Sequence, residues 1–416
     1  MVNKKQPDIR FSGFTDDWEQ CEINDFGKQT FGGGTPKTSI SKYWDGSVPW
    51  IQSSDVKEDV LKVTNPKKRI SEDAIKSSAT KLIPKDSIAV VTRVGVGKLA
   101  LMDYDYATSQ DFLSISGLRL DRWFATYSLY NILKREKNAV QGTSIKGLTK
   151  NDLLTKKVKI PKDRIEQRKI GVLLKQFDES ISLHQQELTT LKKTKQGFLQ
   201  KMFPKKGEKV PEVRFPEFTD NWEEQKFEKI FDVHTDFVAN GSFEALKKNV
   251  KLYSEENYAY MIRLQDASNN WKGPWLYTDK MGFDFLKKST VFENDIIMSD
   301  RGTIGKFFQV PLLDKPMTIS SNAVLLRSSR NDNSFIFYML NTKLIGTQIA
   351  IRTTPGVQPM ISKTEFKKIS AILPSILEQE KIGSFFKQLD DTITLYQREL
   401  ELLQSTKKAF LQKLFV

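Results

Sequence analysis

Apolar residues recur every three or four positions along two long stretches of the chain. The first stretch begins at Ile170 and the second at Ile382, and neither contains a proline. Steps of four and three residues alternate throughout, which is typical of a helix that buries one stripe against another helix. The first stripe contains Ile170, Leu174, Phe177, Ile181, His184, Leu188, Leu191, Lys195, Phe198 and Met202. The second contains Ile382, Phe386, Leu389, Ile393, Tyr396, Leu400, Leu403, Lys407, Phe410 and Leu414. The pattern therefore predicts two long helices with coiled-coil seams.

The two predicted helices need a partner for their apolar stripes. Each covers 38 residues, 166–203 or 378–415, and would be roughly 57 Å long. The nearest partner for each helix is the other one, folded back antiparallel within the chain. Lys195 and Lys407 interrupt the seams at equivalent positions. A polar seam residue can fix the register of a helix pair, or its stem can extend until the ammonium reaches water; the sequence leaves both alternatives open.

The chain consists of two copies of one unit. Residues 166–203 align with 378–415 without a gap and share 21 of 38 residues. The opening segments Pro7–Glu19 and Pro211–Glu223 also match. Self-similarity over such lengths indicates a duplicated architecture.

Two diverged bodies, 21–150 and 225–360, lie between the opening segments and the helices. Both alternate short β-branched runs with Gly, Asp and Asn turns, a pattern of short strands. We therefore predict an α+β protein with two tandem α/β domains, each followed by a long helix. The two helices are expected to pair as an antiparallel coiled coil in a pseudo-twofold internal repeat. The predicted boundaries are 1–160 for the first α/β domain, 161–204 for the first helical segment, 205–373 for the second α/β domain and 374–416 for the second helical segment.

Loops at matching places in the two bodies carry basic, polar and small residues. Arg93–Lys98 matches Arg301–Lys306, and a basic residue at each end of a Gly-containing turn suits a phosphodiester backbone. A later pair of loops, 141–146 and 352–358, also matches. The glycines of Phe31–Lys37 would let the backbone approach a phosphate, or they form an ordinary turn.

Composition points to a polyanionic partner. The 416 residues include 65 Lys+Arg against 51 Asp+Glu, a net charge of +14, which favours nucleic acid. One cysteine excludes an intrachain disulfide, and two histidines argue against a zinc finger. We find no apolar run of membrane-spanning length and no apolar signal-peptide core, so we expect a cytoplasmic protein without a membrane partner.

No catalytic arrangement stands out in the sequence. There is no phosphate-binding loop of the GxxxxGK[ST] type and no credible Ser/His/Asp or Cys/His set. The nearest nuclease-like group is Asp220, Glu224 and Lys226, so a single-chain Mg-dependent nuclease is one alternative function. A coiled-coil scaffold that does not read DNA is another.

The order and duplication of these motifs resemble the specificity (S) subunits of type I restriction–modification enzymes. The resemblance covers essentially the whole chain. It rests on PDIRFSGFTDDWE and PEVRFPEFTDNWE, on GGTPK…KYWDG…VPWIQSSD, on RVGVGK and RGTIGK, and on EQRKIG and EQEKIG helices ending in FLQKMF and FLQKLF. The second copy departs from the pattern, because Phe237–Gly241 replaces the Gly-Gly-Thr-Pro run.

The resemblance implies a non-catalytic subunit of a methyltransferase and endonuclease complex. Two target recognition domains would each read one half of a split double-stranded DNA site, which is asymmetric because the bodies differ. The helices would space the domains and dock two methyltransferase subunits, with two restriction subunits as further candidate partners. S-adenosylmethionine, ATP and Mg would bind the partner subunits, and this chain would hold no cofactor and no metal.

Residues that can donate to phosphates or base edges at these loops are the candidate DNA contacts. In the first body they are Thr35, Lys37, Tyr43, Gln52, Ser53, Arg93, Lys98, Ser109, Gln110, Thr143 and Lys146. In the second they are Arg263, Gln265, Arg301, Lys306, Ser321, Asn322, Arg352 and Thr353.

Overall fold

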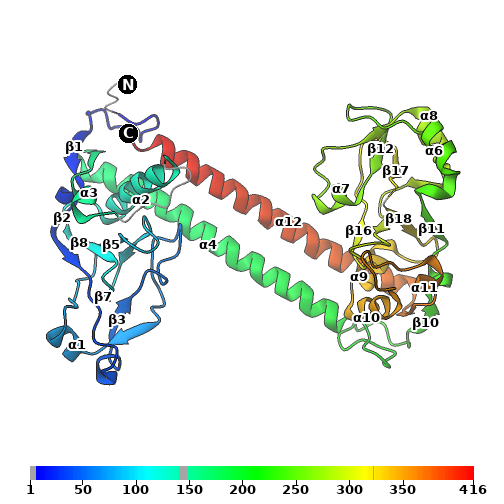
Figure 1. Ribbon diagram of the computed structural model, residues 1–416, viewed down its shortest axis with the longest axis horizontal. Helices are drawn as coiled ribbons and strands as arrows, with labels where there is room; N and C mark the ends of the chain where they lie inside the picture. The colour runs from blue at the N-terminus through cyan, green and yellow to red at the C-terminus, as the bar shows by residue number, and fades with distance from the viewer. Residues whose placement is uncertain (1–5, 140–147, 322) are drawn as a thin grey trace. The chain divides into compact units, whose positions relative to one another are not determined.

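The computed structural model describes residues 6–139, 148–321 and 323–416 (Figure 1). The chain forms two compact units. The first unit comprises Met1–Gln186 with Gln397–Val416, and the second comprises Glu187–Tyr396. Two 38-residue helices, α4 (Arg164–Lys201) and α12 (Ile376–Lys413), match the predicted lengths, and each contributes a part to each unit.

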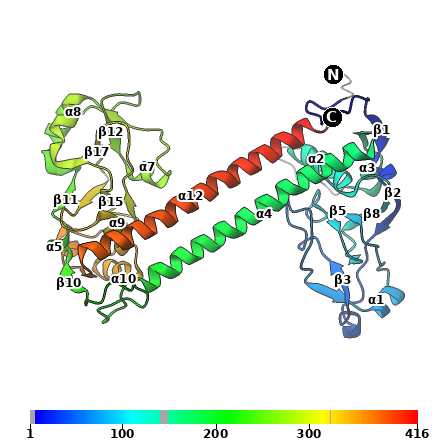
Figure 2. The same cartoon turned by 180° about the vertical axis from the view of Figure 1, so that it is seen from behind.

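Among its described residues, the first unit contains three small sheets. The largest is antiparallel, in the order β2 (Gly27–Gly32), β8 (Phe112–Leu118), β5 (Ser87–Val91) and β6 (Leu99–Met102). The second has the order β4 (Lys68–Ile70), β3 (Val48–Ile51) and β7 (Ala107–Thr108), and β3 runs parallel to β7. The third pairs β1 (Glu19–Glu22) with β9 (Lys157–Ile160). In both views of the ribbon, β3 lies at the end of this unit away from α4 (Figures 1 and 2).

Helices complete the first unit. Their bounds are η1 (Ile23–Phe26), η2 (Ser41–Tyr43), α1 (Glu72–Ser77), α2 (Arg122–Ala139) and α3 (Lys150–Leu154), in addition to the ends of α4 and α12.

The second unit repeats this plan. Its antiparallel sheet has the order β11 (Val233–Asp236), β18 (Val324–Arg327), β15 (Ile296–Met298) and β16 (Phe307–Gln309). Its other sheet has the order β13 (Tyr277–Thr278), β12 (Ala259–Ile262), β17 (Met317–Ile319) and β14 (Thr290–Val291), and β12 runs parallel to β17. β10 (Glu223–Lys226) pairs with β19 (Ser370–Leu373). The helices are α5 (Phe227–Ile230), η3 (Phe237–Asn240), α6 (Phe243–Asn249), α7 (Leu264–Ser268), α8 (Lys280–Phe285), η4 (Lys287–Ser289), α9 (Asn333–Leu340), α10 (Lys343–Arg352) and α11 (Lys363–Lys367).

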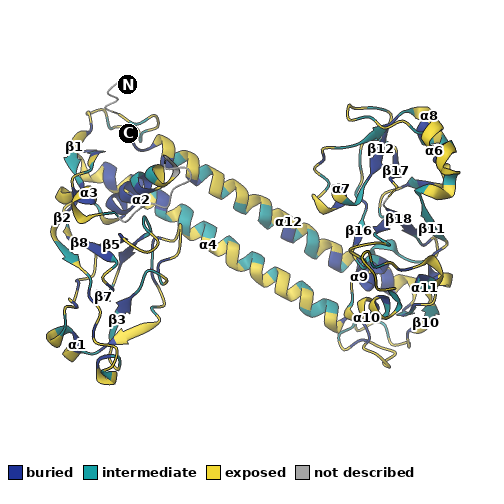
Figure 3. Cartoon of the chain, in the orientation of Figure 1, coloured by how far each residue is buried: buried dark blue, intermediate teal, exposed yellow. Residues whose placement is uncertain are grey.

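In each unit the main core lies between the antiparallel sheet and one helix. Phe124 and Tyr127 of α2 pack with Ile88 and Ile115 in the first unit, and all four are fully buried. Phe335 and Ile336 of α9 take the equivalent place in the second unit. The burial colouring shows α2, β5 and β8 among the buried elements of the first unit (Figure 3). Among the described residues, no helix combines the length and the apolar character needed to cross a bilayer.

The repeated opening segments bind the start of each long helix. Arg10 Nε donates to Glu166 Oε1 at 2.7 Å, Arg10 Nη2 donates to Oε2 at 2.9 Å, and Trp18 Nε1 donates to Oε1 at 3.3 Å. Arg214 and Trp222 bind Glu378 in the same way, at 2.7, 2.8 and 3.3 Å. Both glutamates are 1% exposed, so a bidentate arginine satisfies a buried charge. This requirement explains why Arg, Trp and Glu recur in both copies.

Close helix approach explains a repeated glycine. A Cβ on Gly171 would lie 2.7 Å from Phe124 N, at the start of α2. A Cβ on Gly383 would lie 2.9 Å from Phe335 N, at the start of α9. Only glycine lets the long helix pass so near the neighbouring backbone.

Both seam lysines form ion pairs inside their units. In the first unit Lys407 Nζ donates to Asp178 Oδ1, and the Phe177 and Phe410 rings lie 5.5 Å apart. In the second, Lys195 Nζ lies 2.5 Å from Asp390 Oδ1. Lys407 is 7% exposed, so the alternative in which it extends to water is wrong for this residue.

The other predicted seam positions are all buried or half-buried. They are Ile170, Leu174, Phe177, Ile181, Leu188, Leu191, Phe198, Ile382, Phe386, Leu389, Ile393, Leu400, Leu403 and Phe410.

Candidate nucleic-acid interface

Two parallel strands bring candidate base readers together in the first unit. Ser109 N donates to Ile51 O at 2.9 Å, which continues the β3–β7 ladder beyond both strands. Gln52 and Ser53 therefore lie beside Ser109 and Gln110. Gln110 is exposed, and Gln52 and Ser53 are half-buried. Ser109 is buried and its Oγ donates to Asp111 Oδ2 at 3.2 Å, so it holds the loop in place and is not free to contact DNA.

The β5–β6 hairpin joins the same group of loops. Thr92 N donates to Asp111 O at 2.7 Å, and Val91 N donates to Lys98 O at 2.8 Å. Gly95 and Gly97 adopt φ of +84° and +89°, which permits the tight turn between the two basic residues. Arg93 is exposed and Lys98 is half-buried at the turn. The hairpin thus places a guanidinium and an ammonium next to the Gln52 and Gln110 loops.

Gly33 and Gly34 of the Phe31–Lys37 segment pack closely against neighbouring backbone. Gly34 N donates to Thr108 O at 2.9 Å, and Trp50 Nε1 donates to Gly34 O at 2.9 Å. A Cβ on Gly34 would lie 2.6 Å from the Ala79 carbonyl carbon, and one on Gly33 would collide with Ser109 O. Protein backbone already occupies the space that the phosphate interpretation reserved for a ligand at these two glycines.

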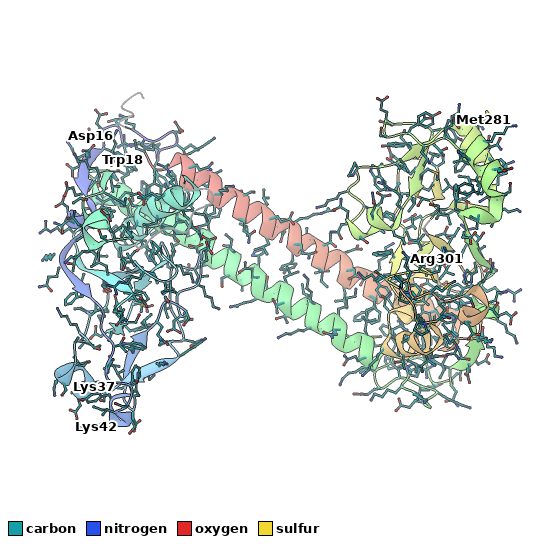
Figure 4. All side chains as sticks on the ribbon, in the orientation of Figure 1. Asp16, Trp18, Lys37, Lys42, Met281 and Arg301 are labelled. Atoms are coloured by element: carbon teal, nitrogen blue, oxygen red, sulfur yellow. The ribbon has the colours of Figure 1, made fainter. Side chains whose placement is uncertain are left out.

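Thr35 and Lys37 after the glycines are exposed. Lys37 lies near Lys42 at the end of the first unit away from Asp16 and Trp18 (Figure 4).

The predicted DNA contact at Tyr43 is wrong, because the side chain is in a core. Tyr43 is 9% exposed and belongs to a cluster with Trp50, Ile70 and Ala107. Its aromatic ring supports the sheet from which Gln52 extends.

The second unit builds the same turn with a different side chain. Ser320 N donates to Ile262 O at 2.8 Å, beyond the parallel strands β12 and β17. Asp266 Oδ2 accepts from Arg263 N at 2.9 Å, as Asp55 Oδ2 accepts from Gln52 N at 2.9 Å. The turn is therefore the same in both units, and Arg263 stands where the first unit has Gln52.

Arg263 is held by intramolecular contacts. Its Nε and Nη2 donate to the Asp266 carboxylate at 3.0 and 2.6 Å, and Nη2 also donates to Pro274 O. Asp266 is 2% exposed, so this pair is largely buried. The Arg263 guanidinium therefore fixes the turn, and its contact with DNA stays a prediction. The neighbouring Gln265 is exposed.

The structure joins two loops that the sequence presents separately. Gly302 N donates to Pro359 O at 2.9 Å and Ile361 N donates to Asp300 O at 3.1 Å. This links 300–306, the loop between β15 and β16, to 353–361. Arg301 and Lys306 are exposed, and Figure 4 places Arg301 well away from Met281 in this unit.

Other candidates of the second unit lie at the ends of elements. Arg352 and Thr353 are half-buried where α10 ends, and both bond back to that helix, through Gln348 O and Ile349 O. Ser321 is exposed. Thr143, Lys146 and Asn322 lie outside the described residues.

Cys21 and His234 are placed by packing and not in a reactive site. Burial raises the pKa of Cys21 to about 11, so it is a thiol at neutral pH. Burial, with the nearby Lys363 and Lys367 charges, lowers the pKa of His234 to about 4. The His234 ring packs edge-on against Phe366 at 5.1 Å, which is a core contact.

The nuclease-like residues form no metal cluster. Glu224 and Lys226 are exposed on β10. Within the part of the chain that the structure describes, no three His, Cys, Asp or Glu side chains are grouped to hold a metal ion.

Sequence reasoning missed the partners of the seam lysines. Asp178 and Asp390 accept from Tyr127 and Tyr338 as well as from the lysines, at 2.5 and 2.8 Å for the tyrosines. The signal was present, because both aspartates recur at the same offset as the seams.

Comparison with known proteins gives a consistent result. The family profile described as "Type I restriction modification DNA specificity domain" matches residues 15–193 and 219–405. The specificity subunit of the type I restriction enzyme MjaIX of Methanocaldococcus jannaschii is 22% identical over 413 residues, covering 96% of this chain and 92% of the relative. That of EcoR124I/EcoR124II of Escherichia coli is 29% identical over 158 residues, or 36% of this chain and 38% of the relative. The crystal structure of the type I restriction–modification S subunit from M. genitalium shares the fold, with a TM-score of 0.59 and 16% identity over 99% of both chains.

Proposed function

Because the chain belongs to the family of type I restriction–modification DNA specificity subunits, we propose that it directs partner subunits to an asymmetric, bipartite DNA site. Each unit reads one half of that site. The observation that carries this proposal is the duplicated set of loops with diverged side chains. The same turn presents Gln52 in one unit and Arg263, which is bonded to Asp266, in the other. The same hairpin has the sequence Arg93-Val94 in one unit and Arg301-Gly302 in the other.

The loop residues divide into two kinds of contact. Arg93, Lys98, Arg301 and Lys306 supply charge for phosphates, which fixes register and orientation. The amides of Gln52, Gln110 and Gln265 have donors and acceptors suited to base edges, above all to adenine. No catalytic step falls to this chain in the proposal. Methyl transfer and cleavage belong to the partner subunits, which bind S-adenosylmethionine, ATP and Mg.

The long helices are the proposed spacer. They pair along their lengths as an antiparallel coiled coil about a pseudo-twofold axis, which the Lys407–Asp178 and Lys195–Asp390 pairs support. Each helix has 38 residues. A length of roughly 57 Å exceeds one DNA turn of about 34–36 Å, so the half-sites are separated by more than one turn.

An outward apolar stripe on each helix supports docking of methyltransferase subunits. Ile165 and Leu183 are 62% and 53% exposed, and the equivalent Leu377 and Leu395 are 66% and 53% exposed. The members of each pair are five helical turns apart, so they lie on one face. Folding gives no reason to retain exposed leucines at equivalent positions, whereas binding the same partner twice does. We therefore assign two methyltransferase subunits to these faces, with two restriction subunits joining through them.

A body exchange tests the reading of DNA. Residues 225–360 are replaced with the body of another specificity subunit, and the methylome of cells that express the hybrid with its methyltransferase is sequenced. We expect one half of the methylated site to change and the other half to stay. A change in both halves would overturn modular reading. Mg-dependent cleavage of DNA by the purified chain alone would favour the nuclease alternative. DNA affinity that does not change with salt concentration would favour a scaffold that does not read DNA.

The docking faces need a separate test. Leu183→Asp with Leu395→Asp should abolish methyltransferase binding and leave the circular dichroism spectrum unchanged. Ser182→Asp with Thr394→Asp is the matched control, because both residues are exposed and lie about 100° around their helices from Leu183 and Leu395. Normal assembly by the double variant would contradict the assignment.

A further inference from the structure

Two valines are exposed at the tips of the interface loops. Val94 is 69% exposed in the β5–β6 hairpin of the first unit, and Val357 is 105% exposed in the 353–361 loop of the second. A single exposed valine is ordinary on a protein surface. In each loop the valine is the most exposed of the large apolar side chains, since Val96 is half-buried in the first loop and Met360 is 41% exposed in the second.

The first valine has a fixed base. Thr92, two residues earlier, donates to Asp111 O through both N, at 2.7 Å, and Oγ1, at 3.0 Å. Val91 N donates to Lys98 O on the other side of the turn. Val94 therefore follows Arg93 at the tip of a hairpin that is anchored to the Gln110 loop.

The second valine stands on an equally anchored loop. Thr354 and Met360 exchange two backbone hydrogen bonds, at 2.9 and 3.2 Å, and close the loop around Val357. Gly302 N, which donates to Pro359 O, ties this loop to the one that carries Arg301. In both units the exposed valine is thus held close to an exposed arginine.

The chemistry of the DNA surface selects one target for these side chains. Charged phosphates offer nothing to an isopropyl group, whereas the C5-methyl of thymine is an apolar group on the major-groove edge of a base pair. Side chains that wedge between base steps in the minor groove are larger, such as Phe, Leu or Met. Resting on the proposed function, we propose that Val94 and Val357 each contact one thymine methyl group, in the half-site of their own unit.

The two units place this contact differently. Gly302 occupies the position of Val94 in the second unit, so the apolar tip has moved from the hairpin to the neighbouring loop. The thymine should therefore occupy different positions within the two half-sites, counted from the loop arginine of each unit. This is a structural source of the asymmetry of the site.

The test removes the methyl groups one at a time. The site is first defined by methylome sequencing, and the complex of the chain with its methyltransferase is titrated with duplexes in which deoxyuridine replaces single thymidines. We expect about fourfold weaker binding at one thymine of each half-site, the effect of losing one buried methyl group. Val94→Ala should bind the thymine duplex about fourfold more weakly and lose its response to deoxyuridine in the first half-site only. Val357→Ala should do the same in the second half-site only, so each variant is the control for the other. Val210→Ala, also an exposed valine, should change neither.

Other outcomes separate the two proposals. If the complex methylates a bipartite site but no deoxyuridine matters, or if both variants keep the wild-type response, the valine contact is refuted and site reading stands. Weaker binding by the alanine variants without any response to deoxyuridine would indicate a minor-groove wedge and would also refute it. If no bipartite site is methylated, the proposed function itself fails.

Discussion

Lys195 Nζ lies 2.5 Å from Asp390 Oδ1, on the partner helix within the second unit. The carboxylate also accepts from Tyr338 Oη at 2.8 Å, so one aspartate joins the two long helices to α9. Burial and the aspartate charge raise the pKa of Tyr338, which keeps the hydroxyl a donor. The first unit repeats the arrangement with Lys407, Asp178 and Tyr127. The lysine that interrupts each apolar seam therefore helps to connect the pair of long helices to the domain packed against them.

Removing one member of this joint should destabilise the first unit. Asp178→Ala leaves the Lys407 ammonium buried and unpaired, which we expect to cost about 3 kcal/mol in the free energy of unfolding. Denaturant titration of the full chain measures this cost. Glu179→Gln, next in the sequence but 58% exposed, should change stability by less than about 0.5 kcal/mol. Equal effects of the two substitutions would show that Lys407 does not depend on Asp178.

The helix glycines offer a paired prediction of opposite sign. Gly171→Ala puts a methyl group 2.7 Å from Phe124 N and should destabilise the first unit by about 2 kcal/mol. Gly197→Ala, in the same helix with nothing within 4 Å of its Cβ, should stabilise by about 1 kcal/mol. Thermal denaturation distinguishes them by the direction of the shift. If Gly171→Ala also stabilises, the close approach of α4 to α2 is wrong.

The pH dependence of the second unit should contain the titration of His234. Its pKa is about 4 in the folded chain against an ordinary value of 6.5, so between these values the unfolded state binds more protons. Stability should therefore rise with pH across this window and be lost on acidification, by up to about 3 kcal/mol. The measurement is hydrogen exchange in β11 as a function of pH. His234→Gln should flatten the profile between pH 4 and 6.5, and an unchanged profile would assign the dependence to other groups.

Two arginines that look alike in sequence should behave differently with DNA. Arg301 is exposed, and we expect Arg301→Ala to weaken binding of the assembled complex and reduce the salt dependence by about one counterion. Arg263 is tied to Asp266, so Arg263→Ala should lower the stability of the α7 turn and leave the salt slope unchanged. Affinities measured over a range of salt concentrations decide between them. A reduced slope for Arg263→Ala would return it to the contact surface.

Regular features of the molecule were predictable because they repeat. The alternation of four- and three-residue steps located both long helices, and the repeat offsets identified Glu166, Gly171 and their equivalents. The roles of these residues were not predictable, because a buried ion pair between positions 10 and 166 leaves no local pattern.

The candidate interface was predictable in its loops and less so in its side chains. Arg93 and Arg301 are exposed as expected. Tyr43 was misplaced and the Asp266 partner of Arg263 was missed, since neither composition nor spacing shows whether an aromatic ring faces a core or whether a guanidinium has an intramolecular partner. Glycines were ambiguous for the same reason: Gly34 fits equally well against a phosphate or against Ala79, and only the fold tells which is there.

The pairing of β1 with β9 has an evolutionary consequence. Glu19 lies opposite Ile160, so the chain enters and leaves the first body through adjacent strands of one ladder. β10 and β19 close the second body in the same manner, with Glu223 opposite Leu373. A gene segment that encodes another body would therefore need only compatible end strands to join the same helices.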